Sequence, residues 1–171
     1  MKLALLICLL VCLESAAQLP RNQTGMFEYS QKITSGLPAV EQLKLKARRF
    51  FNQPFLVHWD SIDVLNGEEH TVITGKGYIN VRAKQHGLSI GRQVPVSLQL
   101  AIDICDSGYT YRFNNFWMNK PKETVHFPLE DKPDDFKQLT YDQVLRNTHE
   151  RVSFVIGWLK GYMEEKSVEQ F

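Results

Sequence analysis

A histidine and an aspartate lie two positions apart in the stretch His58-Trp59-Asp60. On an extended strand, residues i and i+2 point to the same face, so these two side chains would lie side by side. A histidine next to a carboxylate can move protons to and from a substrate when both line a cleft. Outside a cleft the same two residues form an ordinary solvated pair. His58 and Asp60 are therefore weak candidates for acid–base chemistry, and Arg112 on a later strand is a third weak candidate.

Patterns that bind metals or build nucleophilic sites are scarce in this sequence. The histidines show none of the HxH, HxxxH or paired-cysteine spacings typical of zinc sites: they are His58, His70, His86, His126 and His149. A GxSxG turn and a glycine-rich phosphate loop are also missing. We expect the acidic stretch LEDKPDDF to be a solvated loop. Its carboxylates could at most hold calcium weakly: they belong to Glu130, Asp131, Asp134 and Asp135. We predict no catalytic residue, no metal and no cofactor.

The stretch YTYRFNNFW, residues 109–117, carries five aromatic residues and one arginine. Rings on alternate strand positions beside a cation can stack on the bases of RNA. The same alternation, with Tyr109, Tyr111 and Phe113 on one face, is typical of a strand whose rings fill a protein core. A base-stacking surface also needs a basic stripe, but Arg112 is the strand's one cation and the chain's net charge is only +1. We therefore favour core packing and expect no nucleic-acid partner.

The first 17 residues predict export. A lysine at position 2 precedes an apolar run from Leu3 to Leu13, and small residues follow at Ser15 and Ala17. This order is typical of a secretory signal peptide, and the run is too short to span a bilayer. We expect cleavage after Ala17 to release a periplasmic, cell-envelope or secreted protein without a transmembrane anchor. Cys8 and Cys12 would leave with the signal, so Cys105 would remain without a disulfide partner.

The remaining chain is long enough for one domain with its own core. We expect a flexible lead-in over residues 18–25, a single domain over residues 26–166 and a tail over residues 167–171. Alternating apolar residues predict a first strand in MFEYSQKI, and three- and four-residue spacing predicts a helix that ends near Phe51. Period-two patterns then predict four strands. The asparagine–glycine pair at Asn66 could form a two-residue turn, but we favour a four-residue loop that pairs Ile62 with Ile73.

A long amphipathic helix is predicted from Thr140, with Thr140 and Gln143 as a capping box. Its apolar stripe recurs at helical spacing and consists of Tyr141, Val144, Leu145, Thr148, Val152, Val155, Leu159 and Tyr162. Phe154 and Trp158 fall off this stripe, so the second half is apolar on almost every side. Either this half is deeply buried, or Phe154, Trp158 and Tyr162 form a docking surface for a partner or an apolar ligand.

The element order, together with the stretches LKLKARRFF, ITGKGYINV and DSGYTYRF, resembles domain-of-unknown-function family 4468, a family of exported bacterial proteins. The resemblance covers residues 26–163. It implies a TBP-like α+β fold in the order β-α-β-β-β-β-α, with about five antiparallel strands and both helices on one face. The family brings no activity, cofactor or catalytic residue that could be carried over.

Two functions are compatible with this sequence. We favour a non-catalytic exported module that binds a ligand or a protein partner. The alternative is a hydrolase-like envelope enzyme whose site is assembled only in space. A histidine and a carboxylate that meet in a pocket would favour the enzyme, whereas an exposed apolar groove would favour the binding module. The identity of the ligand or partner and the oligomeric state stay open.

Overall fold

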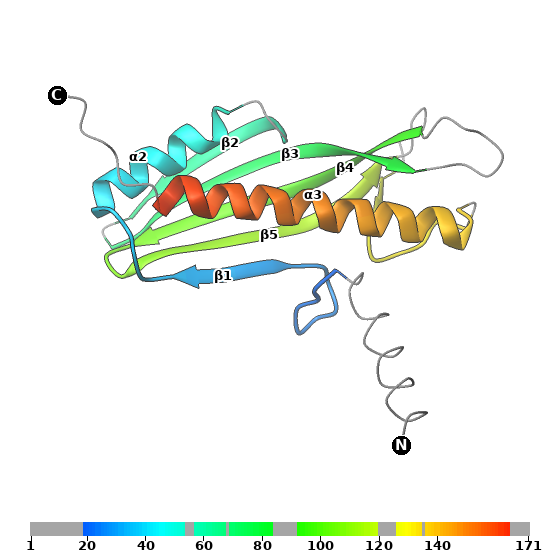
Figure 1. The fold of residues 1–171 in the computed structure, drawn as a ribbon, viewed down its shortest axis with the longest axis horizontal. Helices are drawn as coiled ribbons and strands as arrows, with labels where there is room; N and C mark the ends of the chain where they lie inside the picture. The colour runs from blue at the N-terminus through cyan, green and yellow to red at the C-terminus, as the bar shows by residue number, and fades with distance from the viewer. Residues whose placement is uncertain are drawn as a thin grey trace, which may run out of the picture.

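The structure is a computed structural model, and it describes residues 19–53, 57–67, 69–83, 92–119, 126–134 and 136–164. Within these residues, two helices and six strands follow one another (Figure 1): β1 Tyr29–Ile33, α2 Val40–Phe51, β2 His58–Asn66, β3 Thr71–Ala83, β4 Arg92–Cys105, β5 Gly108–Asn119, β6 His126–Pro128 and α3 Gln138–Glu164. The predicted signal peptide and the predicted tail lie outside the described residues. Among the residues that are described, neither helix has the length and hydrophobicity that a bilayer crossing requires.

The strands form one antiparallel sheet in the order β1-β5-β4-β3-β2, and β6 also pairs with β5. The predicted α+β class and antiparallel sheet are confirmed. The sixth strand was not predicted. β6 is only three residues long, and it pairs with Trp117–Asn119 of β5. β1 pairs with the first half of β5 along the same edge. A strand as short as β6 shows no period-two pattern in the sequence.

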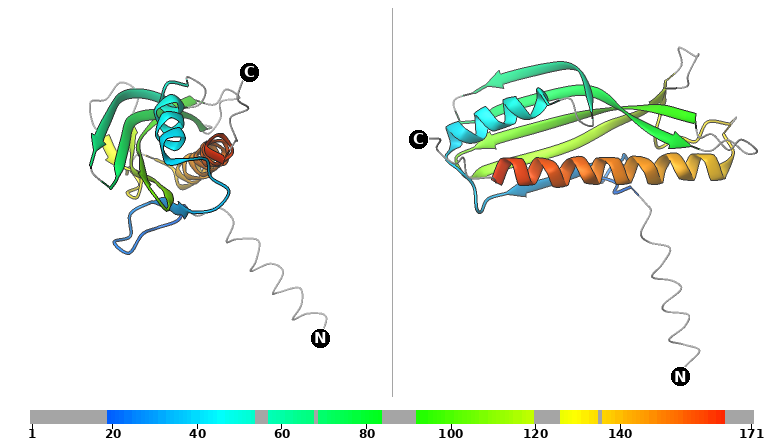
Figure 2. Two further views of the ribbon diagram at one scale, coloured as in Figure 1. Left: turned by 90° about the vertical axis from the view of Figure 1, so that its left-hand side faces the viewer. Right: turned by 45° about the horizontal axis from the view of Figure 1, so that its top comes forward.

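Both helices lie on one face of the curved sheet (Figure 2). This face is built from the alternate residues of β3 and β4, and the buried set includes Ile73, Ile79, Leu100, Ile102 and Ile104. Tyr109, Tyr111 and Phe113 of β5 are buried in the same core. The interpretation of these rings as core residues is therefore confirmed, and the helices separate them from the solvent.

A bulge reverses the alternation of β5 after Phe113. Asn115 has a positive φ of 54°, and the register with β4 shifts between Ser97 and Gln99. Phe116 and Met118 consequently point into the core, whereas Trp117 is exposed on the outer face. Strict alternation would have placed Trp117 inside, so this bulge decides which aromatic ring the outer face carries.

The loop between β2 and β3 has four residues, as we favoured, but its position differs by one residue. Asn66 pairs with Thr71, and Val64 rather than Ile62 pairs with Ile73. Gly67 donates its N–H to the carbonyl of His70 (2.8 Å) and closes the loop. Further along, the register shifts between Trp59 and Ser61, so β2 has a bulge opposite Gly77 and Lys76 of β3.

α3 runs along almost the whole sheet (Figure 1), about 40 Å at 1.5 Å per residue. The predicted stripe is largely confirmed. Its buried members are Tyr141, Val144, Thr148, Val152, Val155 and Leu159, with Met163 in addition. The capping box is wrong, because the helix begins at Gln138 and the N–H groups of Thr140 and Tyr141 already bond to the carbonyl of Lys137. Thr140 thus lies inside the first turn.

The segment before β1 is a folded loop rather than the flexible lead-in that we expected. Leu19 is buried, and Arg21 forms a bridge with Phe27 and lies over its ring at 4.3 Å. The Asn22 side chain accepts hydrogen bonds from the N–H groups of Thr24 (3.0 Å) and Met26 (3.1 Å). Composition suggested flexibility, but an asparagine that bonds to its own loop is typical of a stable turn.

Candidate docking surface on helix α3

The acid–base candidates do not form a site with each other. His58 is exposed and its ring stacks on Tyr78 of β3, with the ring centres 4.9 Å apart. Asp60 is the extra residue of the bulge between Trp59 and Ser61, and it is also exposed. The simple alternation that would bring the two side chains together therefore fails at this position.

The outer face of the sheet carries polar residues that bond to one another. Arg112 lies 3.7 Å from the carboxylate of Glu28, between its Nε and the Oε1 atom. His70 Nδ1 and Asp103 Oδ1 are 3.1 Å apart, and both side chains are about half exposed. Such a pair on an open face has no enclosed space in which to act on a substrate. The histidine–carboxylate contact is therefore best explained as a surface interaction.

The acidic stretch before α3 is only partly the solvated loop that we expected: Asp131, Lys132 and Asp134 are exposed, but other residues are fixed in the fold. Leu129 is completely buried, and Glu130 Oε1 accepts the N–H of Phe27 (2.6 Å) and fixes the N-terminal loop. Tyr141 donates to the carbonyl of Leu129 (2.7 Å).

Within the described ranges no three His, Cys, Asp or Glu side chains could together hold a metal ion. Asp135, one of the calcium candidates, lies outside those ranges.

Cys105, the one cysteine of the domain, is half-buried at the end of β4. Its Sγ lies 3.2 Å from the hydroxyl of Ser107 in the turn that leads to β5. A thiol that is partly buried and hydrogen-bonded to a serine hydroxyl is compatible with a packing role for Cys105.

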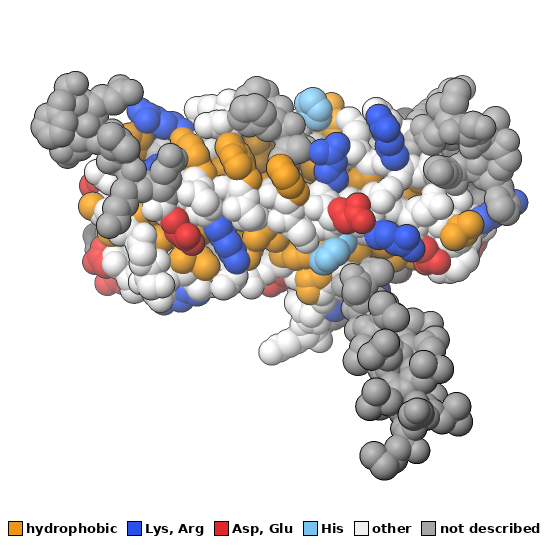
Figure 3. Space-filling model, in the orientation of Figure 1, with side chains coloured by type: hydrophobic (Ala, Val, Ile, Leu, Met, Phe, Trp, Pro, Cys, Tyr) orange, Lys and Arg blue, Asp and Glu red, His pale blue; other side chains and the backbone are white. Residues whose placement is uncertain are grey.

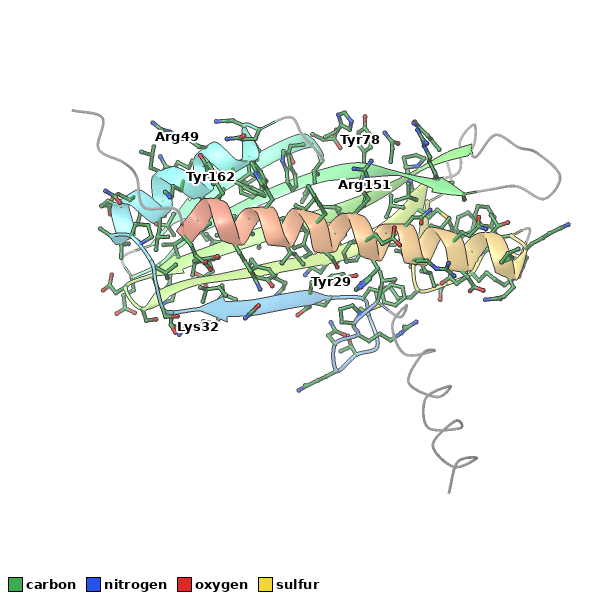
Figure 4. The ribbon with its side chains drawn as sticks, viewed as in Figure 1. Tyr29, Lys32, Arg49, Tyr78, Arg151 and Tyr162 are labelled. Atoms are coloured by element: carbon green, nitrogen blue, oxygen red, sulfur yellow. The ribbon has the colours of Figure 1, made fainter. Side chains whose placement is uncertain are left out.

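Burial and exposure are mixed in the second half of α3. Trp158 is half-buried between two rings: its centre lies 4.9 Å from that of Phe50 on α2 and 5.6 Å from that of Tyr162. Tyr162 also contacts Phe50 (6.4 Å) and lies between α3 and α2 (Figure 4). These two rings join the helices to each other. Phe154 is different, because 62% of its surface is exposed.

An open groove of about 850 Å³ extends from Phe154 toward the end of the helix. We call it the α3 groove, and it is lined by Phe154, Gly157, Trp158, Gly161, Tyr162 and Glu164. In Figure 3 hydrophobic side chains form a row between α2 and α3 on this face of the molecule. The groove therefore exposes the aromatic side chains that the sequence singled out.

Two glycines form the floor of the α3 groove. A Cβ atom added to Gly157 or Gly161 would meet nothing within 4 Å, so the fold itself does not require a glycine at either position. Each glycine inside a helix costs about 1 kcal/mol relative to alanine. A floor without side chains would allow another molecule to approach the helix closely. This feature was not predicted from the sequence, although the two glycines lie four residues apart.

A second, more polar groove of about 530 Å³ adjoins the first at Phe154. It is lined by Asn80, Val81, Arg82, Gln93, Asn147, Glu150, Arg151 and Phe154, from α3 and the ends of β3 and β4. Asn147 donates to the carbonyl of Arg82 and ties α3 to β3 there. Arg151 leaves α3 on the side of β3 (Figure 4). The exposed phenyl ring of Phe154 is thus bordered by an apolar groove on one side and by charged groups on the other.

Burial also marks the other flank of α3. Tyr29 of β1 reaches the helix (Figure 4), and its hydroxyl lies 2.8 Å from His149 Nδ1. Burial raises the pKa of Tyr29 far above that of a free phenol. At the start of β5, burial and then the nearby Glu164 carboxylate raise the pKa of Tyr109 in the same direction. These neutral rings hold α3 on the sheet and leave the opposite side of the helix free for contacts.

Two solved structures have a similar fold. A DUF4468 family protein from Bacteroides ovatus matches with a TM-score of 0.60 at 11% sequence identity, covering 91% of this chain and 95% of that one. A TBP-like protein from Parabacteroides distasonis matches with a TM-score of 0.55 at 13% identity, covering 86% of this chain and 98% of that one. The fold is TBP-like.

The resemblance stated from the sequence is therefore confirmed as a likeness of fold to a DUF4468 family protein. No protein-family model and no curated protein matches the sequence. At these identities the likeness concerns the fold alone, and one fold serves many functions. The function has to be inferred from the surface of the molecule.

Proposed function

We propose that this chain is an exported, non-catalytic binding module that docks a protein partner on the α3 groove. One observation carries the proposal: Phe154 is 62% exposed beside an apolar groove that two glycines keep open. Large exposed apolar groups that gather at one place on a soluble protein are typical of interaction sites.

The shape of the groove favours a protein over a small molecule. Sites for small ligands enclose most of the ligand surface. The α3 groove is instead an open trough along a helix. An amphipathic helix of a partner can lie in such a trough and place its side chains at three- and four-residue spacing. An apolar small molecule is the less suitable occupant.

The surroundings of the groove argue against the hydrolase-like alternative. No histidine is among the residues that line either of the two grooves. The histidine–carboxylate pair of His70 and Asp103 lies on the open outer face of the sheet, away from both. A general acid or base has to lie within hydrogen-bonding distance of the group that it protonates. These observations support binding rather than hydrolysis as the function.

Export is the second part of the proposal, and it is supported by the charged, apolar and small-residue order of residues 1–17. The intact mass of the protein isolated from producing cells tests it. We expect a mass that begins at or near Gln18. Retention of residues 1–17, or a lipid on Cys12, would contradict this part of the proposal.

Site-specific photo-crosslinking in the producing cells tests the docking surface. A benzophenone amino acid replaces Phe154 in one variant and Leu139 in a control. Leu139 is 58% exposed on the same helix but far from the groove. We expect a discrete protein adduct from position 154 and none from position 139. Equal adducts from both positions, or none from position 154, would show that the groove is not a specific docking surface.

A further inference from the structure

The residues on the exposed side of α3 follow an order that would match a second copy of the same helix running in the opposite direction. Side chains recur on this side every three or four residues, so they form one stripe along the helix. We call it the α3 stripe, and it consists of Arg146, Glu150, Phe154, Gly157, Gly161 and Glu164. All six residues are exposed. The stripe begins with a cation, ends with an anion and has an aromatic ring beside glycines in its middle.

We propose that the partner which occupies the α3 groove is a second copy of this chain, with the two α3 helices antiparallel around a two-fold axis. This inference rests on the proposed docking function and names its partner. With the axis beside residues 155 and 156, Arg146 faces Glu164 of the second copy and Phe154 faces Gly157 of the second copy. The same contacts recur on the other side of the axis, as a two-fold interface requires.

Shape supports this pairing. Phe154 is the exposed aromatic group of the stripe, and the floor of the groove beside it has no side chains at Gly157 and Gly161. The phenyl ring of one copy can therefore enter the space over the glycines of the other, between the helix backbone and the rings of Trp158 and Tyr162. Helices approach most closely where the residues at the contact are small.

Charge supports it as well. In the antiparallel arrangement each end of the contact joins Arg146 of one copy to Glu164 of the other. Glu150 faces the uncharged Gly161, so no like charges of the stripe meet. If the two helices were parallel, Glu150 would lie beside Glu150 of the other copy and Phe154 beside Phe154. The space over the glycines would then stay empty. The order of charges thus selects the antiparallel direction.

Sedimentation velocity of the mature full-length chain, over a range of micromolar concentrations, tests the inference. We expect a reversible dimer. Phe154→Ala should raise the dissociation constant at least about tenfold, as for the truncation of a central aromatic group in an interface. Gly161→Ile should have a similar effect because it fills the groove. A Cβ atom at this position meets nothing within 4 Å, so we expect the variant to fold and its far-ultraviolet circular dichroism to stay unchanged.

Charge-reversal variants test whether the dimer forms through α3 or through another surface of the protein. Arg146→Glu and Glu164→Arg should each weaken the dimer by about three- to tenfold, since each contact occurs twice. The double variant should recover most of the loss. The two residues are about 27 Å apart along one helix, so recovery has to come from a contact between copies.

A monomer at every concentration, a dimer that Phe154→Ala leaves unchanged, or a double variant without recovery would each overturn this inference. The proposed docking function has a separate readout, which is the photo-crosslinked adduct at position 154. An adduct with the mass of two copies supports both proposals. An adduct of another mass keeps the docking surface but excludes the second copy as its occupant.

Discussion

Glycine serves two opposite purposes in this protein. At Gly77 the backbone of β2 passes so close that an added Cβ would lie 2.2 Å from the carbonyl oxygen of His58. A backbone atom cannot move aside cheaply, so glycine is required there by the fold. At Gly161 an added Cβ would meet nothing within 4 Å. The proposed contact with a second copy would explain a glycine at this position.

The same substitution should therefore have opposite effects at the two positions. Gly77→Ala should lower the free energy of unfolding by about 1–3 kcal/mol through the clash with β2. Gly161→Ala should raise it by about 1 kcal/mol, because alanine favours the helix. Urea unfolding of dilute protein measures both changes. Destabilisation by Gly161→Ala would mean that this glycine has a role inside the fold.

Three buried tyrosines should make the protein sensitive to alkaline pH. Burial raises the pKa of Tyr29, Tyr109 and Tyr141 in the folded state. In the unfolded chain a tyrosine ionises near pH 10, so the unfolded state loses these protons first. The stabilisation is fully present below about pH 10 and is lost as the pH rises above it.

A titration that follows phenolate absorbance and circular dichroism together checks this expectation. The chain has six tyrosines. We expect these three to ionise only as the secondary structure is lost. If all six ionised before any change in circular dichroism, the three rings would not be buried as the structure places them.

Helix α3 combines a structural side and a free side within the same turns. Trp158 packs between Phe50 and Tyr162, whereas Phe154, one turn earlier, extends into the solvent. From the sequence, burial and docking were alternatives for this half of the helix. Trp158 and Tyr162 pack between α3 and α2, whereas Phe154 borders the groove that we propose for docking.

Alanine substitutions should separate these two sides. Trp158→Ala should lower the free energy of unfolding by about 2–3 kcal/mol, somewhat less than the loss of a fully buried ring. Phe154→Ala should change it by no more than about 0.5 kcal/mol, as is usual for exposed positions. Thermal melts of the two variants in dilute solution give the comparison. Severe destabilisation by Phe154→Ala would show that the ring belongs to the core.

Period-two and helical patterns predicted the elements that carry most of the core. The alternation of apolar residues in β4 and the buried apolar residues along α3 were both visible in the sequence, because a face that is covered imposes a period on the sequence. The bulges at Asp60 and Asn115 were not predicted in position, since a single extra residue leaves no compositional signal. These bulges decide where Asp60 and Trp117 lie. Sequence patterns therefore indicated the fold better than the surface.

The candidate site was predicted only in part. Phe154, Trp158 and Tyr162 were singled out because they fall beside the buried stripe, and the structure places all three along the α3 groove. Gly157 and Gly161 were missed, because their meaning depends on the empty space above them. The folded N-terminal loop was missed for a related reason: the hydrogen bond between Phe27 and Glu130, which fixes it, joins residues far apart in the chain.

The whole molecule presents two very different faces to a partner. On the outer face of the sheet Gln99, Asp103 and Arg112 have polar partners in Asn115, His70 and Glu28. On the helix side, the α3 groove exposes apolar groups beside charges of both signs (Figure 3). Polar groups that already bond to one another gain little from a new partner, whereas exposed apolar groups gain from burial. This contrast supports the proposal that the helix side is the docking face.

Hydroxyl-radical footprinting of the protein in its producing cells, compared with dilute purified protein, tests this central claim most directly. Phe154, Trp158 and Tyr162 report on the helix side, and Trp117, which is 40% exposed, reports on the outer face of the sheet. We predict that oxidation of the α3 residues falls several-fold in the cells while oxidation of Trp117 stays the same. Unchanged oxidation of α3, or protection of Trp117 alone, would contradict the assignment of α3 as the docking surface.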